Sequence, residues 1–117
     1  MKILIIIPAY NEAECIETVV DNLTENYPQY DYVIINDGST DDTRKICARR
    51  HFNFMDLPVN TGLSGAIKSG MRYANYYGYD HVLQLDGDGQ HDPAFIEDMV
   101  KEMESTDCDI VIGSRFK

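Results

Sequence analysis

Basic residues are scarce in this sequence. Ten lysines and arginines stand against twenty acidic residues, and the formal net charge is -10. Phosphate backbones are bound by clusters of lysine and arginine, whereas the basic residues here are scattered, so the chain is not expected to bind nucleic acid. An acidic protein that handles a phosphorylated ligand needs a local device, either a divalent cation or the backbone amides at a helix start.

Cysteines are few, and long apolar runs are absent. Cys15, Cys47 and Cys108 form no Cys-x-x-Cys pair, so neither a disulfide framework nor a zinc site is predicted, and a cytoplasmic location is expected. No apolar run approaches the ~20 residues of a membrane-spanning helix. The run at residues 3–7 is too short for a signal peptide and meets Pro8 without a cleavage site, so it is interpreted as a buried strand.

Hydrophobic periodicity predicts one domain with five strands that alternate with four helices. The strands are expected at residues 3–7, 32–36, 52–57, 81–85 and 109–112, and the helices at residues 12–26, 41–50, 64–77 and 93–105. Such alternation indicates an α/β fold with a doubly wound, mostly parallel sheet. Ligands of these sheets bind at the carboxyl ends of the strands.

The first strand and helix have recognisable boundary residues. Pro8 is expected to end the strand, because proline cannot donate a hydrogen bond to a sheet. Asn11 is the predicted N-cap of the following helix, with Glu12 and Glu14 near the positive end of its dipole.

The sequence Asp-Gly-Asp-Gly follows the strand predicted at residues 81–85. Asp86 and Asp88 stand two positions apart, which turns both carboxylates to the same side of an extended segment. Two such carboxylates repel each other unless a cation lies between them, and Mg²⁺ or Mn²⁺ suits these oxygen ligands. Gln90 adds a neutral oxygen, directly or through water. A simple turn is the alternative, because Asp and Gly are common turn residues.

The loop after the second strand carries a further candidate. Asp37 lies at the strand end, where a carboxylate is able to accept an N–H from a nucleobase edge. Capping of the next helix is the preferred interpretation of Ser39, Thr40 and Asp41.

A glycine-rich segment precedes and enters the third predicted helix. Backbone amides near Gly62 and Gly65, together with Lys68, are placed to meet a diphosphate. Close packing of the helix on the sheet is an equally good reason for these glycines and for Gly70.

Other polar and aromatic residues near these motifs receive a structural interpretation. His91 is expected to be incidental rather than a catalytic base. Four tyrosines favour core packing or an exposed aromatic helix face over a sugar-stacking surface; they are Tyr73, Tyr76, Tyr77 and Tyr79.

Five segments in order resemble the motifs of family 2 inverting glycosyltransferases with a GT-A fold. They are residues 8–12 (PAYNE), 36–41 (NDGSTD), 60–70 (NTGLSGAIKSG), 86–93 (DGDGQHDP) and 113–116 (GSRF). The acidic motif and the closing Gly-Ser-Arg most resemble the polyprenyl-phosphate branch, the relatives of dolichyl-phosphate mannose synthase. The resemblance covers nearly the whole chain.

The resemblance implies a role for each matching position. A nucleoside pocket is implied for Pro8, Ala9, Tyr10 and Glu12. Asp37 is implied to contact the nucleobase. Asp86 and Asp88, with Gln90, are implied to bind the metal and the sugar diphosphate. Arg115 is implied to approach the phosphates. The implied donor is a UDP- or GDP-linked sugar, and the best acceptor is a polyprenyl phosphate at the cytoplasmic face of a membrane.

The sequence departs from the family pattern at two points. The family usually has two acidic residues before Gly-Ser, whereas Asn36 stands at the first of them, so base recognition is expected to rest on Asp37. Family members also continue for about another hundred residues, which supply most of the acceptor site. We therefore interpret residues 1–117 as a single nucleotide-sugar-binding domain that is truncated relative to full-length members, with its catalytic base and oligomeric state unassigned.

Three other classes of protein compete with this interpretation. A receiver domain needs acidic residues directly after the first strand, where this chain has Pro8, Ala9 and Tyr10. A sugar-phosphate nucleotidyltransferase needs a glycine-rich basic loop there. A fragment that binds nucleotide sugar and metal without turnover stays open.

Overall fold

The computed structural model describes residues 2–85, 98, 100, 101 and 110–112. Its elements are β1 (Ile3–Ala9), α1 (Ile16–Asn26), β2 (Asp31–Asp37), α2 (Thr43–Arg49), β3 (Phe54–Leu57), α3 (Gly62–Tyr76), β4 (His81–Gln84) and β5 (Ile110–Ile112). The predicted alternation of strands and helices is confirmed over these residues. Of the helix predicted at residues 93–105, positions 98, 100 and 101 are helical, and the rest lies outside the described residues.

The described strands form one sheet in the order β3-β2-β1-β4-β5, and every pair is parallel. The chain moves outward from β1 through β2 to β3 and then returns to place β4 on the other side of β1. The strand order therefore reverses between β1 and β4. Ligands of open α/β sheets bind outside the carboxyl ends of the strands at such a reversal.

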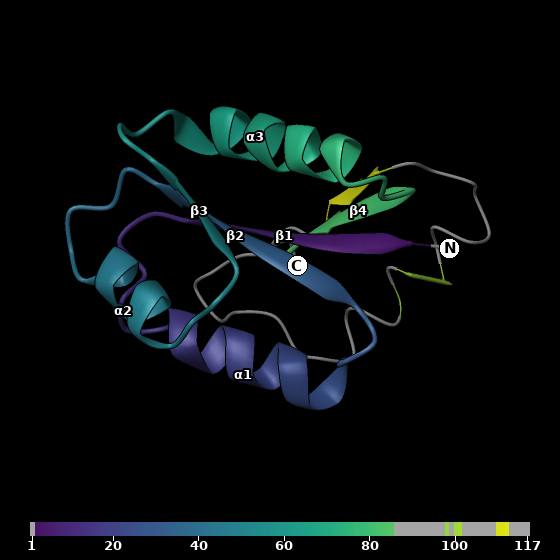
Figure 1. The fold of residues 1–117 in the computed structure, drawn as a ribbon, viewed down its shortest axis with the longest axis horizontal. Helices are drawn as coiled ribbons and strands as arrows, with labels where there is room; N and C mark the ends of the chain where they lie inside the picture. Colours follow the sequence, from purple (N-terminus) through teal and green to yellow (C-terminus); the bar gives the residue numbers. More distant parts are fainter. Residues whose placement is uncertain (1, 86–97, 99, 102–109, 113–117) are drawn as a thin grey trace.

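Helices cover both faces of the sheet, which gives three layers (Figure 1). The alternation of side chains along β1 divides its apolar residues between two cores. Ile5 and Ile7 face α1 and α2, whereas Leu4 and Ile6 face α3. All four are at most 1% exposed, as expected for a strand buried on both faces.

The prediction that Pro8 ends the first strand is wrong, because β1 continues to Ala9. Ile6 turns its carbonyl oxygen toward β4 and accepts a hydrogen bond of 2.9 Å from Leu85 N. Backbone groups two residues apart in a strand point to the same side, so the nitrogen of Pro8 also faces the β4 side, beyond the end of β4. The missing N–H of proline therefore costs no hydrogen bond to β2.

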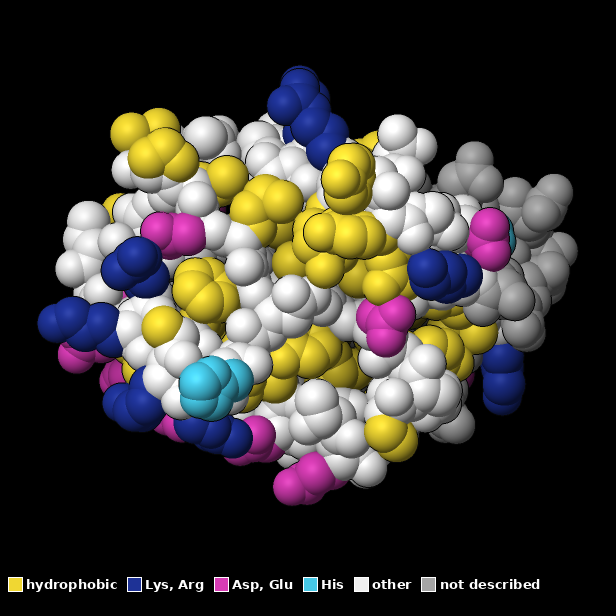
Figure 2. Space-filling view, in the orientation of Figure 1, with side chains coloured by type: hydrophobic (Ala, Val, Ile, Leu, Met, Phe, Trp, Pro, Cys, Tyr) yellow, Lys and Arg dark blue, Asp and Glu magenta, His cyan; other side chains and the backbone are white. Residues whose placement is uncertain are grey.

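Several basic side chains of the described residues pair with acidic ones. Figure 2 shows the basic side chains over α2 lying close to acidic ones. Arg44 pairs with Asp56, and Arg50 pairs with both Glu17 and Asp21. Within the described part of the chain, no helix combines the length and apolar character that crossing a membrane requires.

The tyrosines of α3 and the loop after it divide between core and surface, as predicted. Tyr73 and Tyr79 pack against the core on the α3 side, whereas Tyr76 and Tyr77 are exposed and contact each other edge to face. The Tyr79 hydroxyl donates a 2.7 Å hydrogen bond to Asp31.

Gly70 lets α3 approach the sheet. A Cβ atom at this position would lie 2.7 Å from two side-chain carbons of Ile6, which is itself 1% exposed. Close helix packing, one of the two reasons considered for this glycine, is therefore confirmed. Ala66 and Ala74, one helical turn away on either side, complete the small-residue stripe that faces the sheet.

Replacing Gly70 with valine should therefore destabilise the fold, although valine has the higher helix propensity. Overpacking of this kind costs about 1–3 kcal/mol, which urea unfolding followed by circular dichroism will measure. Asn75→Ala, on the exposed side of α3, is the control and should leave stability unchanged or slightly raised. Equal stability of Gly70→Val and the wild type would contradict the close approach.

Candidate active site at the carboxyl edge of the sheet

The carboxyl ends of β1 and β4 lie side by side at the strand reversal. β1 ends at Ala9, which is 2% exposed, and the loop after it begins with Tyr10, which is 46% exposed. Directly after β4, Leu85 is buried and its N–H donates a hydrogen bond to Ile6 O. The chain therefore reaches the carboxyl edge one residue before Asp86.

Asn11 ties the loop after β1 to the loop after β2. Its φ is 54°, a left-handed conformation that asparagine tolerates better than most residues. Its side-chain oxygen accepts hydrogen bonds from Thr40 N at 2.8 Å and Asp41 N at 3.2 Å, and its own N–H donates to Ser39 Oγ at 2.9 Å. The prediction that Asn11 caps the following helix is wrong, because α1 begins only at Ile16. The Asn11 side chain instead accepts hydrogen bonds from backbone amides of the loop after β2.

Asp41 and Thr43 add a second set of bonds between the same loops. Thr43 Oγ1 accepts from Glu12 N at 3.0 Å and donates to Asp41 Oδ1 at 2.5 Å. The other carboxylate oxygen of Asp41 accepts from Ala13 N at 3.2 Å. Burial acts to raise the pKa of Asp41, but the hydrogen bonds from Thr43 and Ala13 outweigh it and hold that pKa below its ordinary value.

The capping role predicted for Ser39, Thr40 and Asp41 is thus only partly correct. Asp41 also accepts from Thr43 N at 3.0 Å and so supports the start of α2. Ser39 and Thr40 bond to Asn11 in the other loop. The parallel register of β1 and β2 places these two loops next to each other, a proximity that the sequence alone does not show.

Among the described residues, Asp37 is the most buried carboxylate at this edge, with 4% exposure. Its Oδ1 accepts hydrogen bonds from Thr61 N at 2.8 Å and Thr61 Oγ1 at 2.7 Å, which fixes the carboxylate against the start of α3. Its backbone oxygen accepts from Asn60 Nδ2 at 3.1 Å. No hydrogen bond reaches Asp37 Oδ2 from the residues that the structure describes. Asp37 Oδ2 is therefore available to accept a hydrogen bond from a donor outside the described residues.

Gly38 allows the loops after β2 and β3 to meet. Its φ is +68°, and a Cβ atom here would overlap the backbone of Val59 and Asn60. A side chain at this position is therefore excluded both by conformation and by space.

Asn36 lies on the opposite face of β2 from Asp37 and is 1% exposed. Its Nδ2 donates a 2.7 Å hydrogen bond to Asp56 Oδ1, and its Oδ1 accepts from Ser39 Oγ at 2.5 Å. Arg44 Nε donates to the second oxygen of Asp56 at 2.9 Å. Asp56 did not emerge from the sequence, although its place in a strand of otherwise apolar residues was a signal.

The remaining predicted site residues are placed as follows. Pro8 and Glu12 lie at the carboxyl edge beside Tyr10. Lys68 is exposed in the middle of α3, two positions from both Ala66 and Gly70, and therefore on the side of the helix that faces away from the sheet. The structure does not bring Lys68 to Asp37, so its contact with a diphosphate stays a prediction.

The predicted metal ligands and the predicted phosphate contact fall outside the described residues; they are Asp86, Asp88, Gln90 and Arg115. His91 lies outside them as well. Within the residues that are described, no three His, Cys, Asp or Glu side chains gather as a metal site would require. A metal site at this edge therefore depends on the acidic motif after Leu85.

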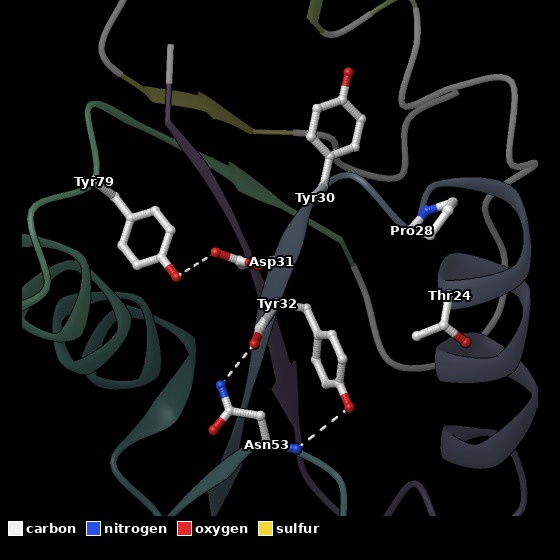
Figure 3. A pocket seen from close by; sticks show the side chains of 7 residues that line it. All are labelled: Thr24, Pro28, Tyr30, Asp31, Tyr32, Asn53 and Tyr79. Carbon is white, nitrogen blue, oxygen red and sulfur yellow. Dashed lines mark hydrogen bonds between the residues drawn. The ribbon is translucent and has the colours of Figure 1, made fainter.

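A hollow of about 460 Å³ lies at the opposite, amino edge of the sheet (Figure 3). Tyr30, Asp31 and Tyr32 line it from β2 and the residue before it. Several of its polar groups are bonded internally: Asp31 accepts from Tyr79, and Asn53 Nδ2 donates to Tyr32 O at 2.8 Å. Its position, away from the strand reversal, separates it from the candidate site.

Comparison with known proteins identifies the family. The family model described as "Glycosyl transferase family 2" matches residues 4–117. The chain belongs to glycosyl transferase family 2. The resemblance of the sequence motifs to this family is thereby confirmed.

Two curated relatives illustrate what the chain is similar to. The chain is 31% identical over 120 residues to undecaprenyl-phosphate mannosyltransferase of Micrococcus luteus, covering 98% of this chain and 49% of that protein. It is 33% identical over 132 residues to UDP-N-acetylglucosamine–dolichyl-phosphate N-acetylglucosaminyltransferase of Methanococcus voltae, covering 98% and 52%. The chain thus spans about half the length of the curated relatives it matches.

Two solved structures confirm the fold. Glucosyl-3-phosphoglycerate synthase from Mycobacterium tuberculosis, in complex with Mn²⁺, UDP and glucosyl-3-phosphoglycerate, matches with a TM-score of 0.70 and 25% identity, over 87% of this chain and 39% of that one. TarS of S. aureus in complex with UDP matches with a TM-score of 0.70 and 21% identity, over 90% and 32%. The expected α/β architecture of GT-A glycosyltransferases is confirmed.

Replacing Asp41 with alanine should loosen the two interlocked loops and lower stability at pH 7. The pKa of Asp41 is lowered in the fold, so its contribution is fully present above the ordinary carboxyl pKa of 3.8 and is lost as the pH falls through the lowered value. The stability difference between the wild type and Asp41→Ala should therefore shrink below pH 3.8, as urea unfolding across the pH range will measure.

Asp42→Ala is the matched control for this variant. The Asp42 side chain is 73% exposed and lies 3.9 Å from Lys45. Its removal should change stability little at any pH. A pH-independent difference for Asp41→Ala would contradict the role of the charged carboxylate.

Proposed function

We propose that this chain is the donor-binding part of a glycosyltransferase that moves a sugar, with inversion, from a nucleoside diphosphate to a polyprenyl phosphate. The observation that carries the proposal is the position of the acidic motif. Asp86 directly follows Leu85, at the end of the strand that borders the reversal between β1 and β4. The binding crevice of an open α/β sheet forms at that point.

Asp37 supports recognition of the nucleobase. It is buried, Thr61 holds one of its oxygens, and the other has no hydrogen-bond donor within the described part of the chain. A carboxylate oxygen fixed in this way favours a ligand that presents an N–H, such as the edge of a uracil or guanine ring. Tyr10, exposed next to β1, offers an aromatic face beside it.

The donor set of the acidic motif fits a divalent cation. Two carboxylates and an amide oxygen, from Asp86, Asp88 and Gln90, are the hard ligands that Mg²⁺ and Mn²⁺ prefer. Such a cation, when bound, would neutralise the negative charge that grows on a departing nucleoside diphosphate. The Mycobacterium tuberculosis relative, crystallised with Mn²⁺ and UDP, supports this assignment.

A phosphate acceptor fits a site for which no general base is assigned. The acceptor oxygen would attack the anomeric carbon as the bond to the diphosphate oxygen breaks. A phosphate oxygen is already anionic, so this attack needs no strong general base, whereas a sugar hydroxyl would need one. The two curated relatives, whose names specify undecaprenyl phosphate and dolichyl phosphate, support this acceptor class.

The donor site can be tested by calorimetry with UDP and GDP, with and without Mn²⁺. Binding should require the metal, and Asp88→Ala should abolish it because the variant loses one of two carboxylate ligands. Asp37→Ala should weaken binding by about tenfold or more, since the loss of a hydrogen bond to a charged group costs about 1.5–3 kcal/mol.

Asp98→Asn is the control, because it removes one negative charge at an exposed position nearby in the sequence. It should bind UDP as the wild type does. Undiminished binding by Asp88→Ala would refute the metal site. Transfer of radiolabelled sugar to polyprenyl phosphate in vesicles then separates a transferring enzyme from a fragment that only binds the donor.

A further inference from the structure

The orientation of the Asn36 amide is determined by its neighbours. A carboxylate only accepts hydrogen bonds, so the group that Asn36 presents to Asp56 at 2.7 Å must be its NH₂. The amide oxygen then faces Ser39 and accepts a hydrogen bond from its hydroxyl group. At 1% exposure, Asn36 is too buried in this structure to contact a ligand directly.

The hydrogen bonds continue in one direction from Asp56 to the loop after β1. Because the Ser39 hydroxyl donates to Asn36, its oxygen is free to accept, and it does so from Asn11 N at 2.9 Å. Asn11 holds its left-handed φ of 54° directly after Tyr10. The series Asp56, Asn36, Ser39, Asn11 thus joins β3 through β2 to the loop at the carboxyl end of β1.

Arg44 completes the charged end of this series. It donates from Nε to the second oxygen of Asp56 at 2.9 Å, so the carboxylate is balanced by one cation and one amide. An aspartate at position 36 would place two carboxylates in contact, with a single arginine to compensate them. The identity of residue 36 is therefore coupled to that of residue 56.

We propose that Asp56 is a positioning residue for nucleotide binding, acting through Asn36 and Ser39 on the loop that carries Tyr10. Asp56 lies on β3, two strands away from that loop, and its effect passes through hydrogen bonds rather than through the ligand. The proposal rests on the proposed function in that the loop after β1 is taken as one wall of the nucleoside pocket.

A charge exchange tests this coupling. N36D should reduce the affinity for UDP in the presence of Mn²⁺ by about tenfold, because repulsion from Asp56 displaces the series. The double variant N36D/D56N restores a carboxylate-to-amide bond with the partners exchanged, and should recover affinity to within about threefold of the wild type. S39A interrupts the series without changing charge and should also weaken binding.

A second measurement reads the loop without any ligand. Hydrogen exchange of the Asn11 backbone amide, followed by NMR, should accelerate about tenfold or more in N36D and in S39A and return toward the wild-type rate in N36D/D56N. E25Q, which removes an exposed charge near the end of α1, is the control and should change neither the exchange nor the affinity.

The outcomes separate this inference from the proposed function. If the wild type binds no UDP, the proposed function fails, while Asn11 exchange still decides whether Asp56 positions the loop. If N36D lowers the melting temperature but leaves both Asn11 exchange and UDP affinity unchanged, Asp56 only stabilises the fold and the inference is overturned. A double variant no better than N36D alone overturns it as well.

Discussion

The two-sided pairing of β1 is the constraint on which the rest of the structure depends. This strand bonds to β2 on one side and to β4 on the other, and its side chains form the centre of both cores. Burying each of its isoleucines contributes roughly 1.5–3 kcal/mol. Because all described strands are parallel, fixing β1 also aligns the carboxyl ends of its neighbours, and the polar loops that follow them share one edge.

That shared edge is organised before any ligand arrives. The loops after β1 and β2 bond to each other through Asn11, Ser39 and Thr43, and the loops after β2 and β3 bond through Asp37 and Thr61. Each such hydrogen bond contributes about 0.5–1.5 kcal/mol net. Together these bonds offset the strain of Asn11, a non-glycine residue in the left-handed conformation. A site built in this way loses little conformational entropy when it binds.

The sequence predicted the elements well because their signals are local. The apolar strands, the helical spacing of the apolar residues in α1 and the carboxyl-edge loops all follow from periodicity, and the family follows from motifs in a fixed order. The cap at Asn11 and the strand end at Pro8 failed for a different reason. Each depends on what lies beside the residue in space, namely the loop after β2 and the end of β4.

Hydrogen bonds between side chains on different strands could not be predicted from the sequence for the same reason. Asn36 stands out as a departure from the family pattern, but its significance depends on Asp56, twenty residues later, which the parallel register of β2 and β3 places opposite it. The Asn36 amide donates a hydrogen bond at the place where the neighbouring strand already supplies the carboxylate of Asp56.

The charge of the described edge bears directly on how a diphosphate would bind. Three acidic residues, Glu12, Asp37 and Asp41, lie in the segments that meet at this edge, and Arg44 pairs with Asp56. Lys68 lies on the far side of α3. At an effective dielectric constant of about 20, a single pair of like charges about 4 Å apart costs roughly 4 kcal/mol. A diphosphate bound at this edge would therefore need its negative charge offset, and a cation held by the acidic motif after β4 would provide that.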